Sequence, residues 1–191
     1  MLLLAWLACA EAPDGPPGAL AFDGPPPRNV LLLSIDTLRA DAVTADDMPF
    51  LAGLAAQGVA LADHVQCSDW TWPSTACTLL GRLPEDLGLA LRIPPAPHEA
   101  LPDGLDPLAV RLGAAGYATA LVSRNAWLGP LYGNAQGYDV HDWGAPDATG
   151  TLERGAALIR ERQGGPWLVH VHLMEPHAPY VPPDAYLDEE A

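Results

Sequence analysis

The chain has 191 residues, a formal net charge of −15 and no lysine, so all nine of its positive residues are arginine. The lack of a broad basic face argues against nucleic acid as a partner and against electrostatic adhesion to an anionic membrane. Hydrophobic residues make up 49% of the sequence and charged residues 17%, which excludes a disordered acidic tail and allows one domain with a core.

The amino terminus has the outline of an export signal. Residues 1–10 are apolar, and the Pro- and Gly-rich residues 11–28 read as a linker. The apolar run is far shorter than the roughly 20 residues of a membrane span. Three alternatives remain open: cleavage at Ala8-Cys9-Ala10, lipidation at Cys9 in a sequence that resembles a bacterial lipobox, or no targeting role. We expect export to the bacterial periplasm or cell envelope, with Cys9 as the only membrane anchor.

Strands and helices are predicted to alternate through the rest of the chain. Apolar or alternating runs predict strands at 29–35, 59–65, 117–123 and 167–173. Helical spacing and stop signals predict helices at 48–57, 74–80 (after Pro73), 105–115 and 152–162. The Pro-rich segment 92–107 is predicted to be irregular. This order predicts an α/β domain over residues 29–191, with a mostly parallel sheet.

Polar residues gather where such a sheet binds ligands, beyond the carboxyl ends of its strands. The predicted positions are Asp36, the 69–74 stretch, Arg124 with Asn125, and Glu175 with His177. Together they would supply a carboxylate, a hydroxyl, an amide and an imidazole to one site.

Two of these residues allow a structural and a chemical interpretation. Asp36 follows a buried strand, where a carboxylate is costly unless it is paired or binds a cation. It could cap a helix or pair with Arg39, or it could be a ligand of a hard divalent cation. Thr71 precedes a helix that Pro73 can start; it could be the N-cap residue, or its metal-activated hydroxyl could attack phosphorus or sulfur.

The histidines and cysteines leave further alternatives. His177 lies between two prolines in a loop, where it could donate to an ester oxygen or protonate a leaving group. His170 and His172 alternate on the last predicted strand and share one face; a packed strand histidine is the favoured interpretation for His170 and an equal alternative for His172. Cys67 and Cys77 could form a disulfide in an oxidising compartment or be buried small hydrophobes.

Four segments in order resemble the amino-terminal half of the sulfatase family, in the alkaline phosphatase-like superfamily. They are RNVLLLSIDTLRAD (28–41), MPFLAGLAAQG (48–58), WTWPSTACTLLG (70–81) and HLMEPHAPYVPP (172–183). The resemblance implies a mostly parallel central sheet with helices on both faces, incomplete at the carboxyl terminus.

The resemblance also implies roles for individual residues. Asp36 falls on a metal ligand, and Thr71 falls on the nucleophile, which also touches the metal. His177 falls on the histidine that binds the substrate anion, and Asn125 falls near the family's Lys-x-His substrate-binding stretch. His172, just ahead of His177, is also predicted to bind substrate. The implied cofactor is a divalent cation, calcium foremost, with magnesium, manganese or zinc as alternatives.

The departures from the family pattern bear on the reaction. Threonine cannot be oxidised to the formylglycine of true sulfatases, so Thr71 would attack directly, which favours phosphate over sulfate esters. The expected function is metal-dependent hydrolysis of a sulfuric or phosphoric ester of a small molecule, glycan or lipid. A phosphoethanolamine-type transferase is an alternative. Asp36 and Thr71 are too few ligands for a stable cation site, so a truncated or inactive anion-binding member is another alternative.

Overall fold

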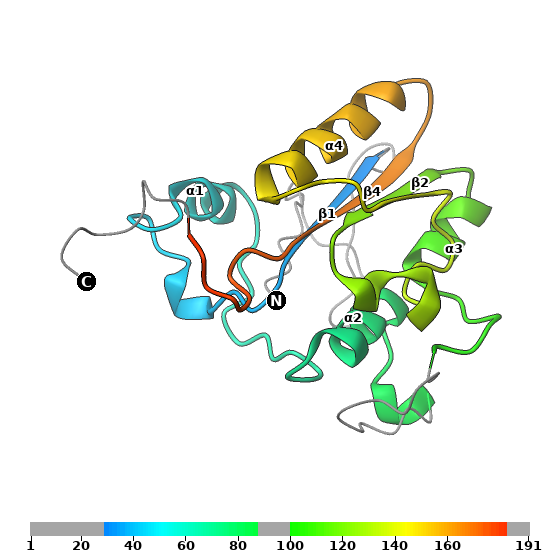
Figure 1. The fold of residues 1–191 in the computed structure, drawn as a ribbon, viewed down its shortest axis with the longest axis horizontal. Coiled ribbons are helices and arrows are strands. Elements are labelled where there is room, and N and C mark those ends of the chain that lie inside the picture. Colours follow the sequence, from blue (N-terminus) through cyan, green and yellow to red (C-terminus); the bar gives the residue numbers. More distant parts are fainter. Residues whose placement is uncertain (1–28, 88–99, 183–191) are drawn as a thin grey trace, which may run out of the picture.

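The computed structural model describes residues 29–87 and 100–182, and its centre is a parallel β-sheet (Figure 1). The strands are β1 (Asn29–Ile35), β2 (Ala118–Ser123), β3 (Val140–Asp142) and β4 (Trp167–Leu173). They lie in the order β1-β4-β2-β3, and every neighbouring pair is parallel. The predicted α/β fold with a parallel sheet is confirmed.

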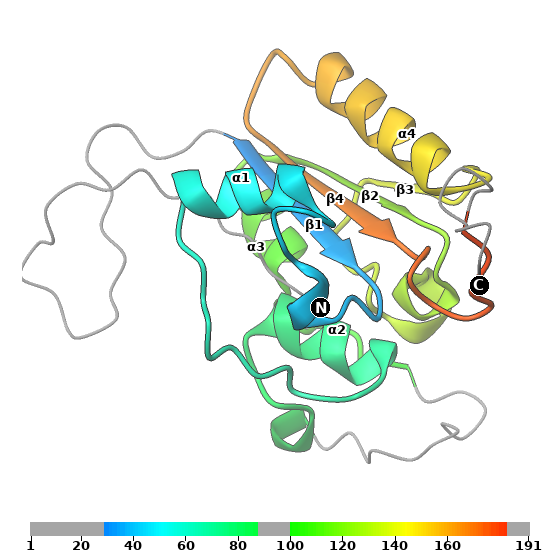
Figure 2. The ribbon, with the colours of Figure 1, turned by 90° about the vertical axis from the view of Figure 1, so that its left-hand side faces the viewer.

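Helices cover both faces of this sheet (Figure 2). The helices are α1 (Pro49–Gln57), α2 (Thr71–Leu80), α3 (Leu108–Ala114) and α4 (Ala148–Glu161). Short 3-10 turns are η1 (Ala40–Ala42), η2 (Pro84–Leu87), η3 (Ala126–Leu128) and η4 (Pro130–Tyr132). Helix α4 lies on one side of the sheet, with α1 and α3 on the other.

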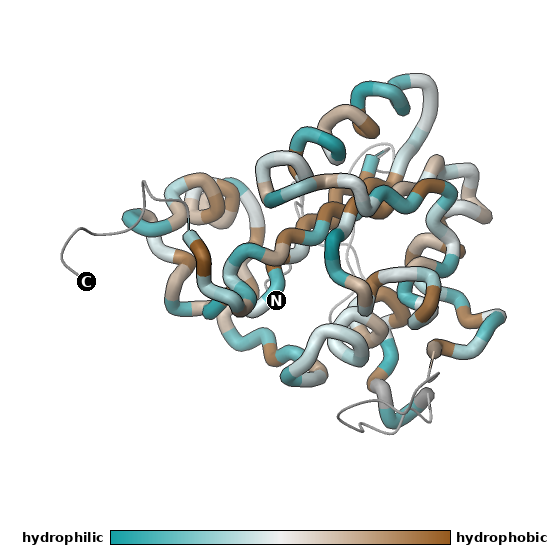
Figure 3. The backbone as a smooth tube through the Cα atoms, in the orientation of Figure 1, coloured by the Kyte–Doolittle hydropathy of each residue, from teal (hydrophilic) through white to brown (hydrophobic). Residues whose placement is uncertain are grey.

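Successive side chains of a strand point to opposite faces of the sheet. One apolar cluster lies between the sheet and α4, and a second, which contains no strand residue, surrounds α2. Figure 3 shows the apolar strands running through the middle of the molecule. On the α4 side, Val169 and Val171 pack with residues of the helix. Helix α4 approaches closely at Gly155, where a Cβ atom would lie 2.6 Å from Val171 Cγ2. On the other side, Trp72 and Ala76 of α2 pack against Leu101. His170 and His172 therefore face away from α4.

The predicted strand at 59–65 is wrong. This segment has no regular secondary structure and runs over the surface, where Leu61 is 60% and Val65 84% exposed. The face of its alternation that carries Val59, Leu61 and Val65 is interrupted by Asp63, whose carboxylate is costly to bury against a sheet. Strand β3 was not predicted, because three residues at a sheet edge are too short to show a pattern. The other predicted strands and helices are present, with ends shifted by up to four residues.

Several predictions lie outside the described residues: the signal segment 1–10 with Cys9, the linker 11–28, and the first half of the Pro-rich segment, 92–99. The described part of that segment, 100–107, contains no helix or strand, as predicted. Among the described helices, none is both long and apolar enough to cross a membrane.

Candidate active site

A cavity of about 300 Å³ opens at the carboxyl edge of the sheet. Its lining comes from the ends of β1 and β4, the first turn of α2, the segment before α2, and η3. The residues that line it are Asp36, Thr37, Gln66, Ser68, Asp69, Trp70, Thr71, Ser74, Thr75, Trp127, His172 and His177. Four of the five predicted site residues thus lie around one cavity, as expected where parallel strands end together.

The carboxylate of Asp36 is the centre of this site. Its Oδ2 atom accepts hydrogen bonds from Thr71 Oγ1 at 2.9 Å and from Asn125 Nδ2 at 2.8 Å, and it lies 3.4 Å from His172 Nε2. Burial alone would raise the pKa of Asp36, but the hydrogen bonds from His172 and Thr71 outweigh it and hold that pKa below its usual value. Asp36 is therefore ionised at neutral pH.

Neither structural interpretation of these residues holds. Arg39 does not pair with Asp36, because its guanidinium binds Asp41 at 2.5 Å. Thr71 is not an N-cap: Trp70 occupies that position, and Thr71 is the first residue of α2. Pro73 fits the first helical turn, where its missing N–H leaves no bond unmade. The Thr71 hydroxyl is thus left to face the Asp36 carboxylate.

The remaining predicted residues occupy different positions around Asp36. His177 is half-buried in the lining, and its Nδ1 donates to the carbonyl of Ala178 at 2.7 Å. His172 is buried and reaches both Asp36 and the cavity. Asn125 does not line the cavity; its Oδ1 accepts from Trp127 N at 3.0 Å while its amide nitrogen holds Asp36. A direct role for Asn125 in substrate binding stays a prediction.

Two of the polar residues predicted after β2 and β4, Arg124 and Glu175, form an ion pair with each other. Arg124 Nη1 lies 3.0 Å from Glu175 Oε1, and neither residue lines the cavity. This ion pair ties the loop after β2 to the loop that carries His177.

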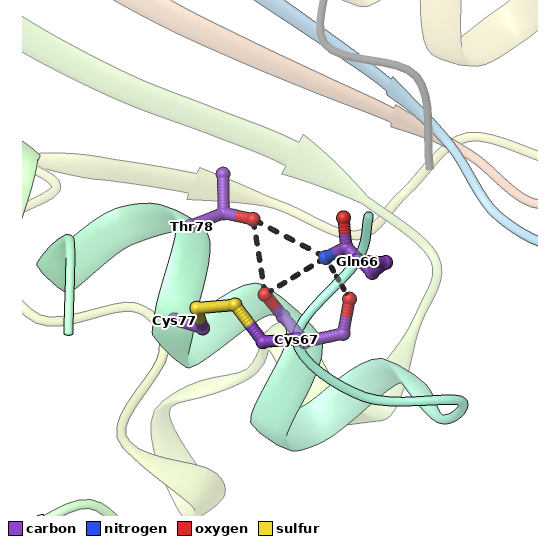
Figure 4. Close-up of a disulfide and its surroundings, with 5 residues drawn as sticks. Gln66, Cys67, Cys77 and Thr78 are labelled. Atoms are coloured by element: carbon purple, nitrogen blue, oxygen red, sulfur yellow. Dashed lines mark hydrogen bonds between the residues drawn. A yellow bond between two sulfur atoms is a disulfide. The ribbon is translucent and has the colours of Figure 1, made fainter. Parts of the chain in front are cut away.

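The segment before α2 is fastened to that helix by a disulfide and a side-chain amide (Figure 4). Cys67 and Cys77 are paired, with their Cα atoms 6.5 Å apart. Gln66 Nε2 donates to the carbonyl of Ser74 at 3.2 Å and also contacts the Ser74 hydroxyl. The alternative of two unpaired cysteines is therefore wrong. These bonds fix the cavity wall that immediately precedes the nucleophile candidate, Thr71.

No individual role was predicted for four residues of the lining: Thr37, Asp69, Trp70 and Trp127, of which Asp69 and Trp70 lie in the predicted 69–74 stretch. Trp70 and Trp127 form an aromatic wall, with ring centroids 5.3 Å apart at 90°. Asp69 adds a second carboxylate, and Thr37 borders the cavity with φ 54°, a left-handed conformation that is rare for a β-branched residue. No pattern in the sequence indicates that Trp127 would meet Trp70, because the two lie on separate loops.

The cavity is lined by acidic side chains, whereas a simple anion-binding site is lined by basic ones. Asp36 and Asp69 line it, and among the described residues none of the lining side chains is an arginine. Carboxylate and hydroxyl oxygens are suitable ligands for a hard cation. Their number is too small, however: within residues 29–87 and 100–182 no group of three or more His, Cys, Asp or Glu side chains could hold a metal ion.

His170, behind this site, should make the fold sensitive to acid. Burial, with a smaller contribution from nearby His172, lowers the pKa of His170 to about 3, against an ordinary 6.5. Between these pH values the unfolded chain binds more protons at this residue, so stability falls as pH falls. We expect the free energy of unfolding, from urea titrations at pH 7, 6, 5 and 4, to decrease through this residue by about 1.4 kcal/mol per pH unit below pH 6, and by about half as much between pH 7 and 6. Shifts at Asp36 and His141 act in the same direction.

The matched variants are His170→Gln, which removes the titration, and His64→Gln at an exposed histidine. His170→Gln should reduce the slope of the free energy of unfolding against pH by the amount that corresponds to about one proton. This holds whatever the variant does to the stability at any one pH. The second should keep the slope of the unmodified chain. An unchanged slope in His170→Gln would show that this ring takes up its proton in the folded state.

Comparisons with known proteins agree with this fold. The family model described as Sulfatase matches residues 28–191. A 2-O GAG sulfatase superposes with a TM-score of 0.59 at 16% identity, over 78% of this chain and 35% of that chain. The phosphonate monoester hydrolase of Agrobacterium radiobacter superposes with a TM-score of 0.65 at 20% identity, over 84% of this chain and 43% of that chain.

The chain thus spans less than half the length of either protein. A search of curated proteins finds no match. At these identities the two structures establish the fold alone, which is alkaline phosphatase-like. The family match covers nearly all of the chain, and the chain therefore belongs to the sulfatase family.

Proposed function

We propose that this protein is a divalent-cation-dependent hydrolase of sulfuric or phosphoric esters in which Thr71 is the nucleophile. The observation that carries the proposal is the Thr71 hydroxyl, 2.9 Å from the ionised Asp36 in a cavity that His177 also lines. A hydroxyl held by a carboxylate at this distance is a nucleophile paired with a proton acceptor.

The proposed reaction has two displacement steps. Thr71 Oγ1 forms a bond to phosphorus or sulfur, its proton passes to Asp36, and the bond to the leaving alcohol breaks. His177 donates a proton to that alcohol's oxygen. Water then attacks the phospho- or sulfo-threonine and gives its proton to His177, the bond to Thr71 Oγ1 breaks, and the proton on Asp36 returns to that oxygen, which releases the inorganic anion and restores the hydroxyl. Because a threonine ester cannot collapse to an aldehyde, we propose a preference for phosphate over sulfate esters.

A bound cation would compensate for two features that weaken Thr71 and Asp36 as a nucleophile and its base. The lowered pKa of Asp36 makes it a poor base, and the cavity places two carboxylates near an anionic ester. Asp36 Oδ2 is occupied by hydrogen bonds, whereas none of the hydrogen bonds found among the described residues reaches Oδ1. We propose that Asp36 and Thr71 contribute to a site for calcium, the ion that the family resemblance favours. Such an ion would offset the negative charge and favour ionisation of the hydroxyl. The described residues do not complete this site.

The substrate and the compartment are also proposed. The two similar structures are a 2-O GAG sulfatase and a phosphonate monoester hydrolase. The substrate classes that we propose are accordingly esters of a glycan, a lipid or a small molecule. Export to the cell envelope is supported by the Cys67–Cys77 disulfide, because disulfides persist in oxidising compartments. Lipid attachment at Cys9 is proposed from the lipobox-like sequence alone.

The test is a paired assay on p-nitrophenyl phosphate, p-nitrophenyl sulfate and a p-nitrophenyl phosphonate monoester. Each ester is offered with calcium, magnesium, manganese or zinc, and with a chelator. We expect turnover above the uncatalysed rate with at least one cation, loss of that turnover with chelator, and faster release from phosphate than from sulfate. No turnover of any ester with any of these cations would refute a hydrolase function for this chain.

A further inference from the structure

A chain of buried hydrogen bonds runs from the core of the sheet to Asp36. The hydroxyl of Ser34 lies 2.8 Å from His170 Nε2 and 2.8 Å from His172 Nδ1, and all three residues are at most 2% exposed. At the far end, the Tyr138 hydroxyl lies 3.0 Å from His170 Nδ1. At the near end, His172 Nε2 lies 3.4 Å from Asp36 Oδ2. Ser34 and His172 are direct neighbours in the parallel pairing of β1 and β4.

The direction of each hydrogen bond in this series follows from the groups at its two ends, Asp36 and Tyr138. Asp36 is ionised and can only accept, so the His172 nitrogen that faces it carries the hydrogen. His172 Nδ1 then accepts from Ser34, whose oxygen accepts from His170 Nε2–H. His170 Nδ1 is left to accept from the Tyr138 hydroxyl. In this arrangement Ser34, His170 and His172 each donate once and accept once, so each polar side-chain atom of these three residues has a partner.

The reversed arrangement fits less well. It would turn the lone pair of His172 Nε2 toward the ionised Asp36 carboxylate, 3.4 Å away. That nitrogen would then accept only through a long 3.5 Å contact with Asn125 Nδ2, which already donates to Asp36 at 2.8 Å. It would also make Tyr138 an acceptor, and the described residues offer its hydroxyl hydrogen no partner except His170. Burial raises the pKa of Tyr138 and lowers the pKa of His170 to about 3, so the tyrosine keeps its proton and the His170 ring stays neutral.

We propose that Ser34, His170 and Tyr138 are positioning residues that hold His172 in its Nε2–H tautomer, with that N–H directed at Asp36 beside Thr71. In the opposite tautomer, a nitrogen lone pair would face the carboxylate and repel it. We call the hydrogen-bonded series Tyr138–His170–Ser34–His172 the relay. It keeps Asp36 Oδ2 occupied by three donors and so fixes the carboxylate that holds the nucleophile. The importance of the relay for catalysis rests on the proposed function, whereas the Nε2–H tautomer of His172 does not.

The test is the protonation pattern of the histidine rings in long-range ¹H–¹⁵N spectra of the full chain, with His170→Gln and His172→Gln assigning the signals. Both rings should be protonated at Nε2 and unprotonated at Nδ1. In Ser34→Ala, His172 should lose this preference and show two nitrogens of averaged character. In Tyr138→Phe, the change should be confined to His170. Thr151→Val removes another buried hydroxyl, one that donates to the carbonyl of Asp147, the N-cap residue of α4, and should change neither ring.

In a chain that turns over esters, Ser34→Ala should also lower kcat by about tenfold with little change in KM, as expected when a positioning hydrogen bond is lost. A proton on His172 Nδ1 in the unmodified chain would overturn the relay. So would a Ser34→Ala spectrum in which His172 is unchanged, because Ser34 would then serve packing alone. An Nε2–H pattern in a chain without turnover would refute the proposed hydrolase and leave the relay standing.

Discussion

Thr71→Val should lower kcat for ester hydrolysis by about 10³-fold or more, a loss of the size seen when an enzyme's nucleophile is removed. Valine keeps the shape and volume of threonine but replaces the hydroxyl that donates to Asp36 with a methyl group. Among the described residues no other hydroxyl donates to Asp36, so we expect residual turnover to come from direct attack by water. The measurement is steady-state hydrolysis of the preferred ester with its cation, together with a search for phospho- or sulfo-threonine on the quenched protein.

Two further variants separate chemistry from folding. Thr71→Ser retains a hydroxyl and should retain most of the turnover. Thr78→Val makes the same change on the same helix, outside the cavity lining, where the hydroxyl donates to the Ser74 carbonyl. It should change kcat by no more than about twofold. Equal turnover in Thr71→Val and the unmodified chain would exclude Thr71 as the nucleophile.

The fold could be predicted where the sequence pattern is long and local. Asn29–Ile35 and Trp167–Leu173 are apolar runs bounded by polar or turn residues, and both became strands with the predicted bounds. The segment 59–65 shows the limit of this reasoning, because alternation does not reveal whether a neighbouring strand is available. Strand β3 exists only through its pairing with β2, which the local sequence does not encode.

The site could be predicted where strand ends carry the chemistry. Asp36, His172 and His177 meet in one cavity because parallel strands end at one edge. Thr71 reaches the same cavity from the first turn of α2, because the strand predicted before it is absent. The buried hydrogen bonds that hold these site residues in place could not be predicted. Ser34 is a single polar residue in an apolar run, and only the β1–β4 register shows that it lies between two histidines. Asn125 was expected to contact substrate, yet its amide is used within the protein to hold Asp36.

Trp72→Ala should lower the free energy of unfolding by about 3–5 kcal/mol, as the deletion of a large buried side chain does. Trp72 is 1% exposed and packs with Ala76, Leu80 and Leu101. Its Nε1 also donates to the carbonyl of Tyr132 at 3.0 Å, so truncation both opens a cavity and removes a partner from that carbonyl. The total stability of a domain is about 5–15 kcal/mol, so a fraction of the variant could be unfolded without denaturant. Urea unfolding followed by circular dichroism measures the change.

The control is Phe50→Ala, which removes an aromatic side chain that is 73% exposed on α1 and should change stability by about 0.5 kcal/mol or less. Trp72→Phe should fall between the two, because it keeps most of the packing and loses the hydrogen bond to Tyr132. A loss below about 1 kcal/mol in Trp72→Ala would contradict a packed core beneath α2. Because Trp72 directly follows Thr71, the contacts that stabilise this core also hold the first turn of α2, and with it the hydroxyl, against Asp36.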